Sequence, residues 1–546
     1  MRLRRNSKAR RIAILSAFCL AVFLFDCLSG GVVGDFLSLS AAVVDDSPGR
    51  WDRHPVVLLH REAEKQFENF LSRQSKSPGE AEVEYQSRYG REPPPGFRRW
   101  VEYALANHAP VIDDYDIIAE GVHPFLNYSA AELTRKVDDA LKDSIGKHSA
   151  ICELASGSFG PGCRNWADPL TRLLGDAAPL VPDVKFLINF LDEPSVLPGN
   201  EAERSGNTES TSWADMSHHN MASTIAEACR DTERAVTNAP QTTGIRFVTN
   251  ITAERDLCQH PEYASQHGFV MCPTTFHRLS SHVPMLSRAA PNPFADILFP
   301  ATHYSLDSSL YSPWSDWTWS AKKNAVYWTG SSNGGKWSSE TWRGGHRQRL
   351  VALATGRDAR QFTLLRSNDM DHPTNDEDAS FQPYTADDID TDLFDVGLTR
   401  NAGCASASVC EEQARFFGPL RRPDVESRPL RYRFAMDVDG NSFSGRFYRF
   451  LASRSVPLKV SVFREWHDDR LWPWLHYIPV SVDMGELPEL VRFLTSTAEG
   501  QQIGRRVAEA GSEWYSRALA PKQQGIYLYR LMLEMARLQD ESREPG

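Results

Sequence analysis

Three segments of the sequence place side chains suited to proton transfer or phosphate binding at the ends of expected strands. The first contains Asp192, which follows the apolar run 184–191. A carboxylate at the end of a buried strand can remove a proton from a hydroxyl group if its pocket keeps it ionised and oriented. Glu193 competes for the same role, and Asp192 could instead simply cap the turn before Pro194. The segment therefore offers a candidate general base.

The second segment is a glycine- and serine-rich turn that follows the apolar run 324–328. It contains Gly330 and Ser331 and leads to a helix expected at 346–355, with Arg347 in its first turn. Backbone N–H groups of such a turn and the N-terminus of a helix can bind phosphate oxygens. Arginine in a first helical turn opposes the helix dipole, and a bound anion would offset that cost. A solvated surface turn is the alternative interpretation.

The third segment is the turn after a strand expected at 432–437. Asp439 and Ser442 lie in this turn, and Arg446 follows one helical turn later. Asp437 and Asp439 form a D-x-D triplet, which can hold a divalent cation against a nucleotide-sugar diphosphate but is frequent by chance. Arginine binds phosphate in a bidentate manner, so Arg446 could contact an anion at this turn. A surface helix with solvated arginines would explain the pattern equally well.

Short apolar runs alternate with helical segments along most of the chain. The runs expected to form buried strands are 184–191, 324–328, 432–437 and 456–462. The segments expected to be helical are 346–355, 444–453 and the C-terminal 45 residues. This alternation predicts an α/β fold with parallel strands, which binds ligands at the carboxyl ends of its strands. The acidic segment 369–395 predicts an irregular loop.

The overall charge argues against nucleic-acid binding. The chain has 546 residues with 60 basic and 71 acidic side chains, a net charge of −11. Six of the basic residues lie in the first eleven positions, so the remainder carries 54 − 71 = −17. Proteins that bind nucleic acid present a basic surface instead. The length allows roughly two to four domains of about 150 residues.

The first 36 residues have the composition of a targeting segment. The basic cluster precedes an apolar run at 12–25, and further apolar residues extend to Phe36. A cleaved signal peptide and an uncleaved signal-anchor both fit, and we favour the anchor because no small-residue cleavage site stands out. The flanking positive charge stays cytoplasmic, so the body of the chain faces the lumen in both cases. The polar helical stretch 58–88 predicts a stem or, equally, surface helices of the main domain.

Other features fit a luminal location. Asn127 and Asn250 begin glycosylation sequons, although such triplets also occur by chance. Two cysteine pairs are close enough in sequence to close small loops in an oxidising compartment: Cys152 with Cys163, and Cys404 with Cys410. Among Cys229, Cys258 and Cys272, one must stay free or pair elsewhere. No cysteine and histidine set has zinc spacing, so we expect no structural metal.

These segments together resemble glycosyltransferase family 90, which contains fungal capsule-associated proteins and the animal protein O-glucosyltransferases of the Notch pathway. The closest resemblance is the block D-V-D-G-N-S-F-S-G-R-F-Y-R-F-L-A-S-R-S-V-P-L-K at 437–459, which continues at 463–480. Further similar motifs are Y-G-R-E-P-P-P-G-F at 89–97, I-D-D-Y-D at 112–116, L-I-N-F-L-D-E-P at 187–194, and Y-W-T-G-S-S followed by H-R-Q-R. The motifs are most similar to those of the fungal members of the family.

The resemblance implies a fold related to the GT-B type, with two Rossmann-like domains facing a cleft. It implies inverting transfer of xylose or glucose from a UDP-sugar to a hydroxyl of a glycan or glycoprotein, without an obligatory metal or other cofactor. By the same resemblance Asp192 falls on the general base. Arg347 and Arg446 fall on the arginines that grip the donor diphosphate, and Gly330 with Ser331 on the loop beside it.

One departure from the family concerns the donor pocket. Animal members have an arginine just before the Gly-Ser pair, where this chain has Thr329, so the resemblance leaves the fit of the sugar open. Asp437 and Asp439 are expected to order the turn or to contact the ribose or sugar of the donor, without binding a metal, and Ser442 is expected with Asp439 among the donor-binding residues. Xylose is the first expectation for the sugar.

The pattern and the resemblance together predict five parts of the chain. They are a cytoplasmic tail with signal-anchor at 1–36, a helical stem at 37–108, an acceptor-side Rossmann-like domain at 109–320, a donor-binding Rossmann-like domain at 321–495, and C-terminal helices at 496–546. We therefore expect a single-pass type II protein of the Golgi or endoplasmic reticulum membrane with a luminal body.

Other classes of function fit less well. A luminal carbohydrate-binding protein without turnover is the main alternative, because 14 Trp, 16 Tyr and 27 Phe would suit sugar stacking. Such a protein would need neither a base nor two diphosphate arginines. A glycoside hydrolase needs two carboxylates across a sugar, and the side chains of the adjacent Asp192 and Glu193 would diverge. The near match of 330–336 to a nucleoside-triphosphate loop is followed by Trp337, where a Ser or Thr hydroxyl is required.

Overall fold

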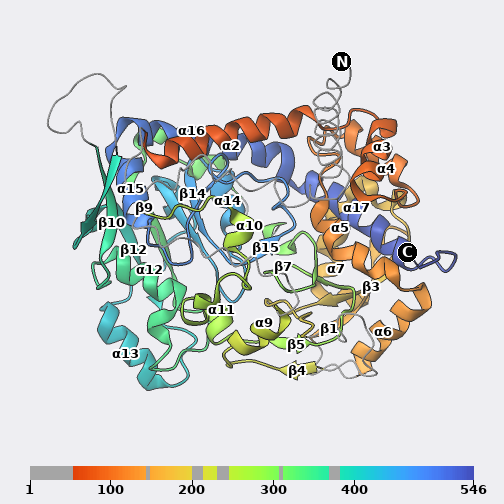
Figure 1. The fold of residues 1–546 in the computed structure, drawn as a ribbon, viewed down its shortest axis with the longest axis horizontal. Helices are drawn as coiled ribbons and strands as arrows, with labels where there is room; N and C mark the ends of the chain where they lie inside the picture. The colour runs from red at the N-terminus through yellow and green to blue at the C-terminus, as the bar shows by residue number, and fades with distance from the viewer. Residues whose placement is uncertain are drawn as a thin grey trace, which may run out of the picture. The chain divides into compact units, whose positions relative to one another are not determined.

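Two five-stranded β-sheets organise the protein (Figure 1). The computed structural model describes residues 53–142, 148–199, 213–229, 245–305, 311–367 and 381–545, all of which belong to one compact unit. The expected signal-anchor at 1–36 lies outside the described residues. The fold is mixed α/β, and both sheets contain parallel strands, as the alternating pattern predicts.

The first sheet has the strand order β2-β1-β3-β6-β8. Its strands are β1 (Ser149–Ala155), β2 (Ser158–Phe159), β3 (Val184–Asn189), β6 (Met285–Ser287) and β8 (Ile297–Leu298). β1 runs antiparallel to β2 and β3, whereas β3, β6 and β8 run parallel. The carboxyl ends of these three parallel strands therefore share one edge of the sheet, where ligands of α/β proteins bind.

The second sheet is entirely parallel and has the order β12-β9-β13-β14-β16. Its strands are β9 (Lys323–Ser331), β12 (Phe394–Arg400), β13 (Tyr432–Val438), β14 (Val456–Val460) and β16 (Ile478–Pro479). β13 and β14 are buried almost throughout, which explains their near-continuous apolar sequences. The four strands expected from apolar runs are thus confirmed as β3, β9, β13 and β14.

Three short antiparallel pairs complete the strands. They are β4 (Trp213–Asp215) with β5 (His277–Leu279), β7 (Ala289–Ala290) with β15 (Arg464–Glu465), and β10 (Phe362–Ser367) with β11 (Phe381–Ala386). The prediction of an irregular loop at 369–395 is wrong for 381–386, which form β11 and pair with β10, and for 394–395, where β12 begins. Residues 387–390 are irregular as predicted, and 391–393 form one short 3₁₀ turn. Residues 369–380 lie outside the described ranges.

Helices surround the sheets. The α-helices are α2 (Pro55–Ser72), α3 (Pro78–Tyr89), α4 (Phe97–Ala106), α5 (Asp116–Val122), α6 (Ala130–Lys142), α7 (Ala167–Leu174), α9 (Ala222–Ala228), α10 (Ile251–Glu254), α11 (Gly268–Met271), α12 (His346–Ala354), α13 (Ala407–Phe417), α14 (Phe447–Leu451), α15 (Leu487–Ser496), α16 (Ala498–Trp514) and α17 (Pro521–Leu538). The helices expected at 346–355 and at the C-terminus are confirmed. The one expected at 444–453 is shorter, because 442–446 form a turn before α14.

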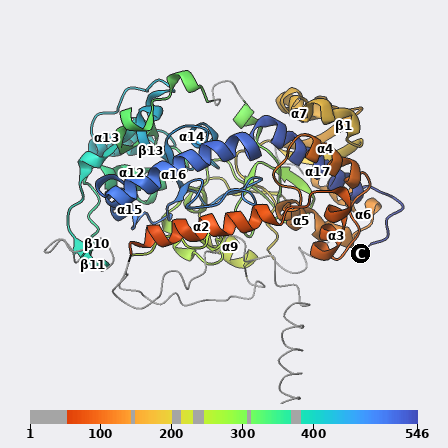
Figure 2. The ribbon, with the colours of Figure 1, turned by 90° about the horizontal axis from the view of Figure 1, so that it is seen from above.

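The helices between residues 55 and 106 pack against the body of the protein. Figure 2 shows α2 alongside α16, and the two helices are in contact. His54 Nε2 lies 3.0 Å from Glu489 Oε1, and Trp100 Nε1 donates to Ile526 O at 3.0 Å. Of the two interpretations of the polar helical stretch, these contacts support helices of the main body for the part of 37–108 that is described.

One continuous hydrophobic core connects both sheets and the helices around them. It includes Ile188 of β3, Val326 of β9, Phe434 of β13 and Leu528 of α17, each buried. Full burial of such a side chain stabilises the fold by roughly 1.5–3 kcal/mol relative to exposure. The core therefore fixes the two sheet edges on which the candidate site depends.

The expected luminal features have these positions. The structure contains the disulfides Cys152–Cys163, Cys404–Cys410 and Cys229–Cys258, and Cys272 is free and buried. Asn127 is exposed, while the Asn250 side chain accepts a hydrogen bond from Ala253 N at the start of α10. Within the described ranges, every helix is too short or too polar to span a membrane.

Candidate active site

The carboxyl end of β9 leads into a tight loop against β13 and α12. A Cβ on Gly330 would lie 2.8 Å from the Trp328 ring, so this glycine leaves room for the indole. Gly334 has φ +103°, and a Cβ there would lie 2.9 Å from Gly440 O. Such close backbone approach and positive φ require glycine. The glycine-rich turn thus brings the ends of β9 and β13 into contact.

Arg347, the second residue of α12, lies across this junction. Its Nε donates to Asp439 O at 2.6 Å, and its Nη1 donates to Ser331 O at 3.1 Å and also to Asn333 Oδ1. All of these acceptors are neutral. Among the described residues, no carboxylate lies within ion-pair distance of this buried guanidinium.

Arg446 supplies a second positive charge at the same place. Its Nη1 donates to Thr329 O at 2.8 Å, and it also has no ion-pair partner in the described ranges. The Arg347 and Arg446 guanidinium carbons lie 5.7 Å and 5.8 Å from the centre of the Trp328 ring. Burial and the charge of Arg446 lower the pKa of Arg347 to about 9. Arg347 is buried and Arg446 is half-buried, and neither has an ion-pair partner in the described ranges, although the carboxylates of Asp437 and Asp439 act on Arg347 from a greater distance. Two adjacent cations without a directly paired carboxylate favour a ligand with multiple negative charges.

Buried acceptor and hydroxyl groups lie beside the two arginines. Asp437 Oδ2 lies 3.1 Å from Lys459 Nζ, and Asp439 Oδ2 accepts from Val462 N at 2.9 Å. The Oδ1 atoms of both aspartates and Ser442 Oγ are buried without a hydrogen-bond partner in the described part of the chain. Unpaired buried polar atoms are costly, so these three atoms mark where ligand hydroxyl or amide groups could bind.

Two neutral histidines fix the Asp439 turn. His346 Nε2 lies 2.9 Å from Asp439 O, and Gly268 N donates to His346 Nδ1 at 3.3 Å. A carbonyl can only accept and a backbone N–H can only donate, so the proton of His346 is on Nε2. His267 stacks on His346 with ring centres 4.1 Å apart, and its Nε2 lies 3.3 Å from Asp439 Oδ2. Burial lowers the pKa of His267 to about 3, so it also stays neutral.

A disulfide-closed segment supports the glycine-rich loop from the other side. Trp337 N donates to Gly403 O at 2.6 Å, and Ala405 N donates to Trp337 O at 2.7 Å. A Cβ on Gly403 would lie 2.2 Å from Gly335 O. Cys404 is bonded to Cys410 immediately beside this contact. The disulfide therefore restrains the segment on which the loop rests.

Asp192 lies at the carboxyl edge of the first sheet, directly after β3. Its side chain is 53% exposed, and its Oδ1 accepts from Arg288 Nη2 at 2.7 Å. Arg288 follows β6, the neighbouring parallel strand, and also donates to Leu191 O at 2.7 Å. Asp192 Oδ2 has no partner among the described residues. Asp192 thus combines a fixed orientation with one free carboxylate oxygen.

Glu193, the competing carboxylate, has a different environment. It is buried, and it accepts hydrogen bonds from Thr275 N at 3.1 Å and Thr275 Oγ1 at 2.8 Å. Burial, with a further contribution from the charge of Asp192, raises the pKa of Glu193 to about 7. Both oxygens of Glu193 are therefore engaged by the protein, which leaves Asp192 as the better placed of the two.

The two sheet edges meet at the turn before α14. Thr274 Oγ1 donates to Asn441 Oδ1 at 3.1 Å, and the Arg288 guanidinium lies 5.9 Å from the centre of the Phe443 ring. His303, which follows β8, packs directly on Gly445. The structure thus gathers Gly330, Ser331, Arg347, Asp439, Ser442 and Arg446 at one sheet edge. It links Asp192 to them through Arg288 and the 441–446 turn.

Several residues at this junction have no recognisable signal in the sequence. Arg288 and His303 follow strands of three and two residues, which are too short for a period to be detected. Asn333 and His267 are brought to Arg347 and Asp439 only by tertiary packing. The sequence feature that could have pointed to Arg288 is its place after a short apolar run.

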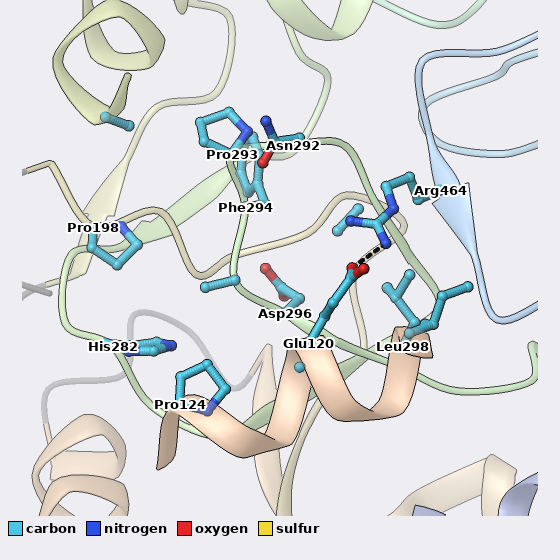
Figure 3. A pocket seen from close by; sticks show the side chains of 15 residues that line it. Glu120, Pro124, Pro198, His282, Asn292, Pro293, Phe294, Asp296, Leu298 and Arg464 are labelled. Atoms are coloured by element: carbon cyan, nitrogen blue, oxygen red, sulfur yellow. Dashed lines mark hydrogen bonds and ion pairs between the residues drawn. The ribbon is translucent and has the colours of Figure 1, made fainter. Parts of the chain in front are cut away.

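A cavity of about 350 Å³ lies beside the first-sheet edge, between α5 and the segment 290–298 (Figure 3). The ion pair of Glu120 with Arg464 crosses it, and Pro124, Pro198 and Phe294 supply apolar surface. β15 pairs Arg464 with Ala290, two residues after Arg288. The cavity therefore adjoins the side of the site that carries Asp192.

Comparison with known proteins agrees with this geometry. A family model described as "Glycosyl transferase family 90" matches residues 390–544, which include Asp439, Ser442 and Arg446. The chain carries a glycosyl transferase family 90 domain. Asp192, Gly330, Ser331 and Arg347 lie outside the matched residues.

The chain is also similar to animal proteins. It is 27% identical over 124 residues to Protein O-glucosyltransferase 2 of Danio rerio, covering 22% of this chain and 24% of that protein. It is 26% identical over 242 residues to the O-glucosyltransferase rumi homolog of Anopheles gambiae, covering 43% and 51%. The homolog of Aedes aegypti is 31% identical over 110 residues, covering 20% and 27%. The chain thus spans about a quarter to a half of the length of these relatives.

Proposed function

We propose that this protein is an inverting glycosyltransferase that transfers a sugar from a UDP-sugar to a hydroxyl group of a glycan or glycoprotein. The family 90 domain and the similarity to proteins named O-glucosyltransferases support the class of reaction. The sugar is xylose or glucose in this proposal, with xylose as the first choice. The relatives' names concern glucose, and that specificity belongs to those proteins.

The observation that carries the proposal is the pair of arginines, Arg347 buried and Arg446 half-buried, neither of which has an ion-pair partner in the described ranges. Arg347 and Arg446 approach the same tryptophan, and burial lowers the pKa of both side chains. Two neighbouring cations without a directly paired carboxylate repel each other, so a bound anion would offset the cost of this arrangement. A pyrophosphate matches the paired planar donors in charge and in geometry.

In the proposed reaction Asp192 is the general base. Its free Oδ2 accepts the proton of the acceptor hydroxyl while that oxygen bonds to the anomeric carbon. The bond between the anomeric carbon and the β-phosphate oxygen breaks at the same time, and UDP leaves. A well-placed base contributes about 10²–10⁴ in rate. Attack opposite the leaving group inverts the configuration of the anomeric carbon.

The departing UDP gains negative charge on its β-phosphate. In our proposal Arg347, Arg446 and the backbone N–H groups of the glycine-rich loop stabilise this charge, which develops only as the bond breaks. We propose that these guanidinium groups serve the purpose for which other enzymes use a divalent metal ion. Asp439 and Ser442 then bind the ribose or the sugar through their unpartnered oxygens.

We further propose a GT-B-like arrangement, with the acceptor on the first-sheet side and the donor on the second-sheet side. The contact of Thr274 with Asn441 and the cavity crossed by Glu120 and Arg464 support this division. Three disulfides indicate an oxidising compartment. We therefore propose a luminal body in the endoplasmic reticulum or Golgi, anchored through residues 1–36.

The direct test is a donor panel. Purified protein is incubated with UDP-xylose or UDP-glucose and a set of glycan and glycoprotein acceptors, and released UDP is measured. We expect acceptor-dependent release with one donor, a product whose anomeric configuration is inverted by NMR, and no transfer by Asp192→Asn. A protein that binds no UDP and releases none from either donor would contradict the proposal.

A further inference from the structure

His303 lies at the centre of the junction between the two sheet edges. It belongs to the 3₁₀ helix η6 (Thr302–Ser305), which follows β8. A Cβ added to Gly445 would lie 2.2 Å from Cδ2 and 2.3 Å from Nε2 of the imidazole. The ring is therefore in direct contact with the backbone next to Arg446, one of the two arginines without an ion-pair partner in the described ranges.

Arg288 and the proposed base Asp192 are also close enough to His303 for their charges to act on it. The Arg288 guanidinium holds Asp192 at 2.7 Å and lies 5.9 Å from the ring centre of Phe443, two residues before Gly445. His303 thus lies near both the carboxylate that would take the acceptor proton and the arginine that would bind the diphosphate.

The backbone at His303 is held firmly by its neighbour. Tyr304 is buried, its hydroxyl donates to Glu465 Oε2 at 2.6 Å, and its ring stacks on Tyr448 at 3.7 Å. His303 itself is exposed and makes no side-chain hydrogen bond within the described ranges. A fixed backbone that presents an imidazole with both nitrogens free suits ligand contact better than a structural role.

The chemistry of the ring identifies the ligand group. Partial burial and the charge of Arg288 lower the pKa of His303, so the ring is neutral at neutral pH. A neutral imidazole donates from one nitrogen and accepts at the other, as a sugar hydroxyl does at its oxygen. The anomeric carbon must lie between the attacking hydroxyl and the leaving phosphate, and His303 lies near the residues that we assign to both.

We propose that His303 hydrogen-bonds the transferred sugar of the donor and determines which neutral sugar is accepted. The inference rests on the proposed function, because it names a specificity-determining residue of that site. Gly445 is required for this position of His303, since any side chain at 445 would displace the imidazole.

The test compares donor selection among His303→Ala, Gly445→Ala, the double variant and His303→Gln. The measured quantity is the ratio of kcat/KM for UDP-xylose to that for UDP-glucose. We expect each single alanine variant to change this ratio roughly 3- to 10-fold, the effect of losing one hydrogen bond. The double variant should match His303→Ala, because both changes remove one interaction. Glutamine, which keeps a donor and an acceptor, should restore part of the selection.

Two measurements separate this effect from damage to the fold or to the diphosphate site. The Kd of UDP without a sugar should stay within twofold of wild type in every variant. Gly79→Ala, at a position with open space around it, is the matched glycine control and should leave the ratio unchanged. If His303→Ala leaves the ratio of the two kcat/KM values unchanged, including by lowering kcat/KM equally for both donors, the inference is wrong.

Failure of the proposed function would look different. A wild-type protein that binds neither UDP nor a UDP-sugar contradicts that function and this inference together. A wild-type protein that binds the donors without turnover contradicts only the catalytic function. The ratio of the two donors' Kd values then tests His303 in the same variants, and an unchanged ratio contradicts the inference.

Discussion

Replacement of Arg446 by methionine should weaken UDP binding without lowering the stability of the unliganded protein. Its guanidinium is buried against Trp328, donates one hydrogen bond to Thr329 O, and has no carboxylate partner in the described ranges. A charge-assisted hydrogen bond contributes roughly 1.5–3 kcal/mol. Arg446→Met should therefore weaken UDP binding about 10- to 150-fold.

The stability of the unliganded protein should respond differently. Burial and the charge of Arg446 lower the pKa of Arg347 from 12.5 to about 9, which corresponds to roughly 5 kcal/mol against its charged form. Methionine at 446 removes the repulsion between the charges of Arg446 and Arg347, and it loses one hydrogen bond to Thr329 O. The free energy of unfolding without ligand should stay within about 1 kcal/mol of wild type, or rise, as is common when binding residues are removed.

Two assays decide the matter. Calorimetric titration gives the Kd of UDP, and urea unfolding with and without UDP gives the stability, which UDP should raise much less in the variant. Arg449→Met is the matched control, because Arg449 lies on the same helix but pairs with Glu426. It should keep the affinity of wild type. An Arg446→Met protein that is folded and binds UDP within threefold of wild type would refute the assignment.

Three further predictions concern the base, its neighbour and the disulfide beside the donor loop. Asp192→Asn should lower transfer about 10²- to 10⁴-fold while the Kd of UDP changes only a few-fold, and steady-state kinetics showing near wild-type transfer would exclude Asp192 as the base. Because burial raises the pKa of Glu193 to about 7, wild type should lose stability relative to Glu193→Gln as pH rises from about 4.5 through 7, by up to roughly 3 kcal/mol. Urea unfolding at about pH 5 and about pH 8 measures this, and a constant difference would contradict the assigned environment. Replacing Cys404 and Cys410 by serine should lower the free energy of unfolding by about 2 kcal/mol, from the entropy of the released loop, and weaken UDP binding; unchanged values of both would show that the disulfide does not restrain the loop.

The fold could be predicted from the sequence where an element is long enough to show a pattern. β3, β9, β13 and β14 are five to nine residues long. Most residues of β3, β13 and β14 are buried, and β9 is buried at its centre, 326–328, so each appears as an apolar run. β6 and β8 have three and two residues, and their place in the first sheet depends on pairing with β3. The strand β11 was hidden by its acidic surroundings, because pairing with β10 outweighs local composition.

The site residues likewise fall into those with a local sequence signal and those positioned only by tertiary packing. Arg347 is recognisable as a cation in a first helical turn, and Arg446 as part of a distinctive block of sequence. Arg288 and His303 gain their positions from β6 and β8, strands of three and two residues, so nothing local distinguishes them. The neutral state of His346 depends on a backbone N–H from Gly268 and a carbonyl from Asp439, and only the folded chain brings these together.

The structure of the protein bound to UDP tests the central claim most directly. The predicted result places the pyrophosphate within hydrogen-bonding distance of the guanidinium groups of both Arg347 and Arg446, with its β-phosphate directed toward His303 and Asp192. A UDP molecule bound elsewhere, or a pyrophosphate whose β end points away from Asp192, would contradict the claim.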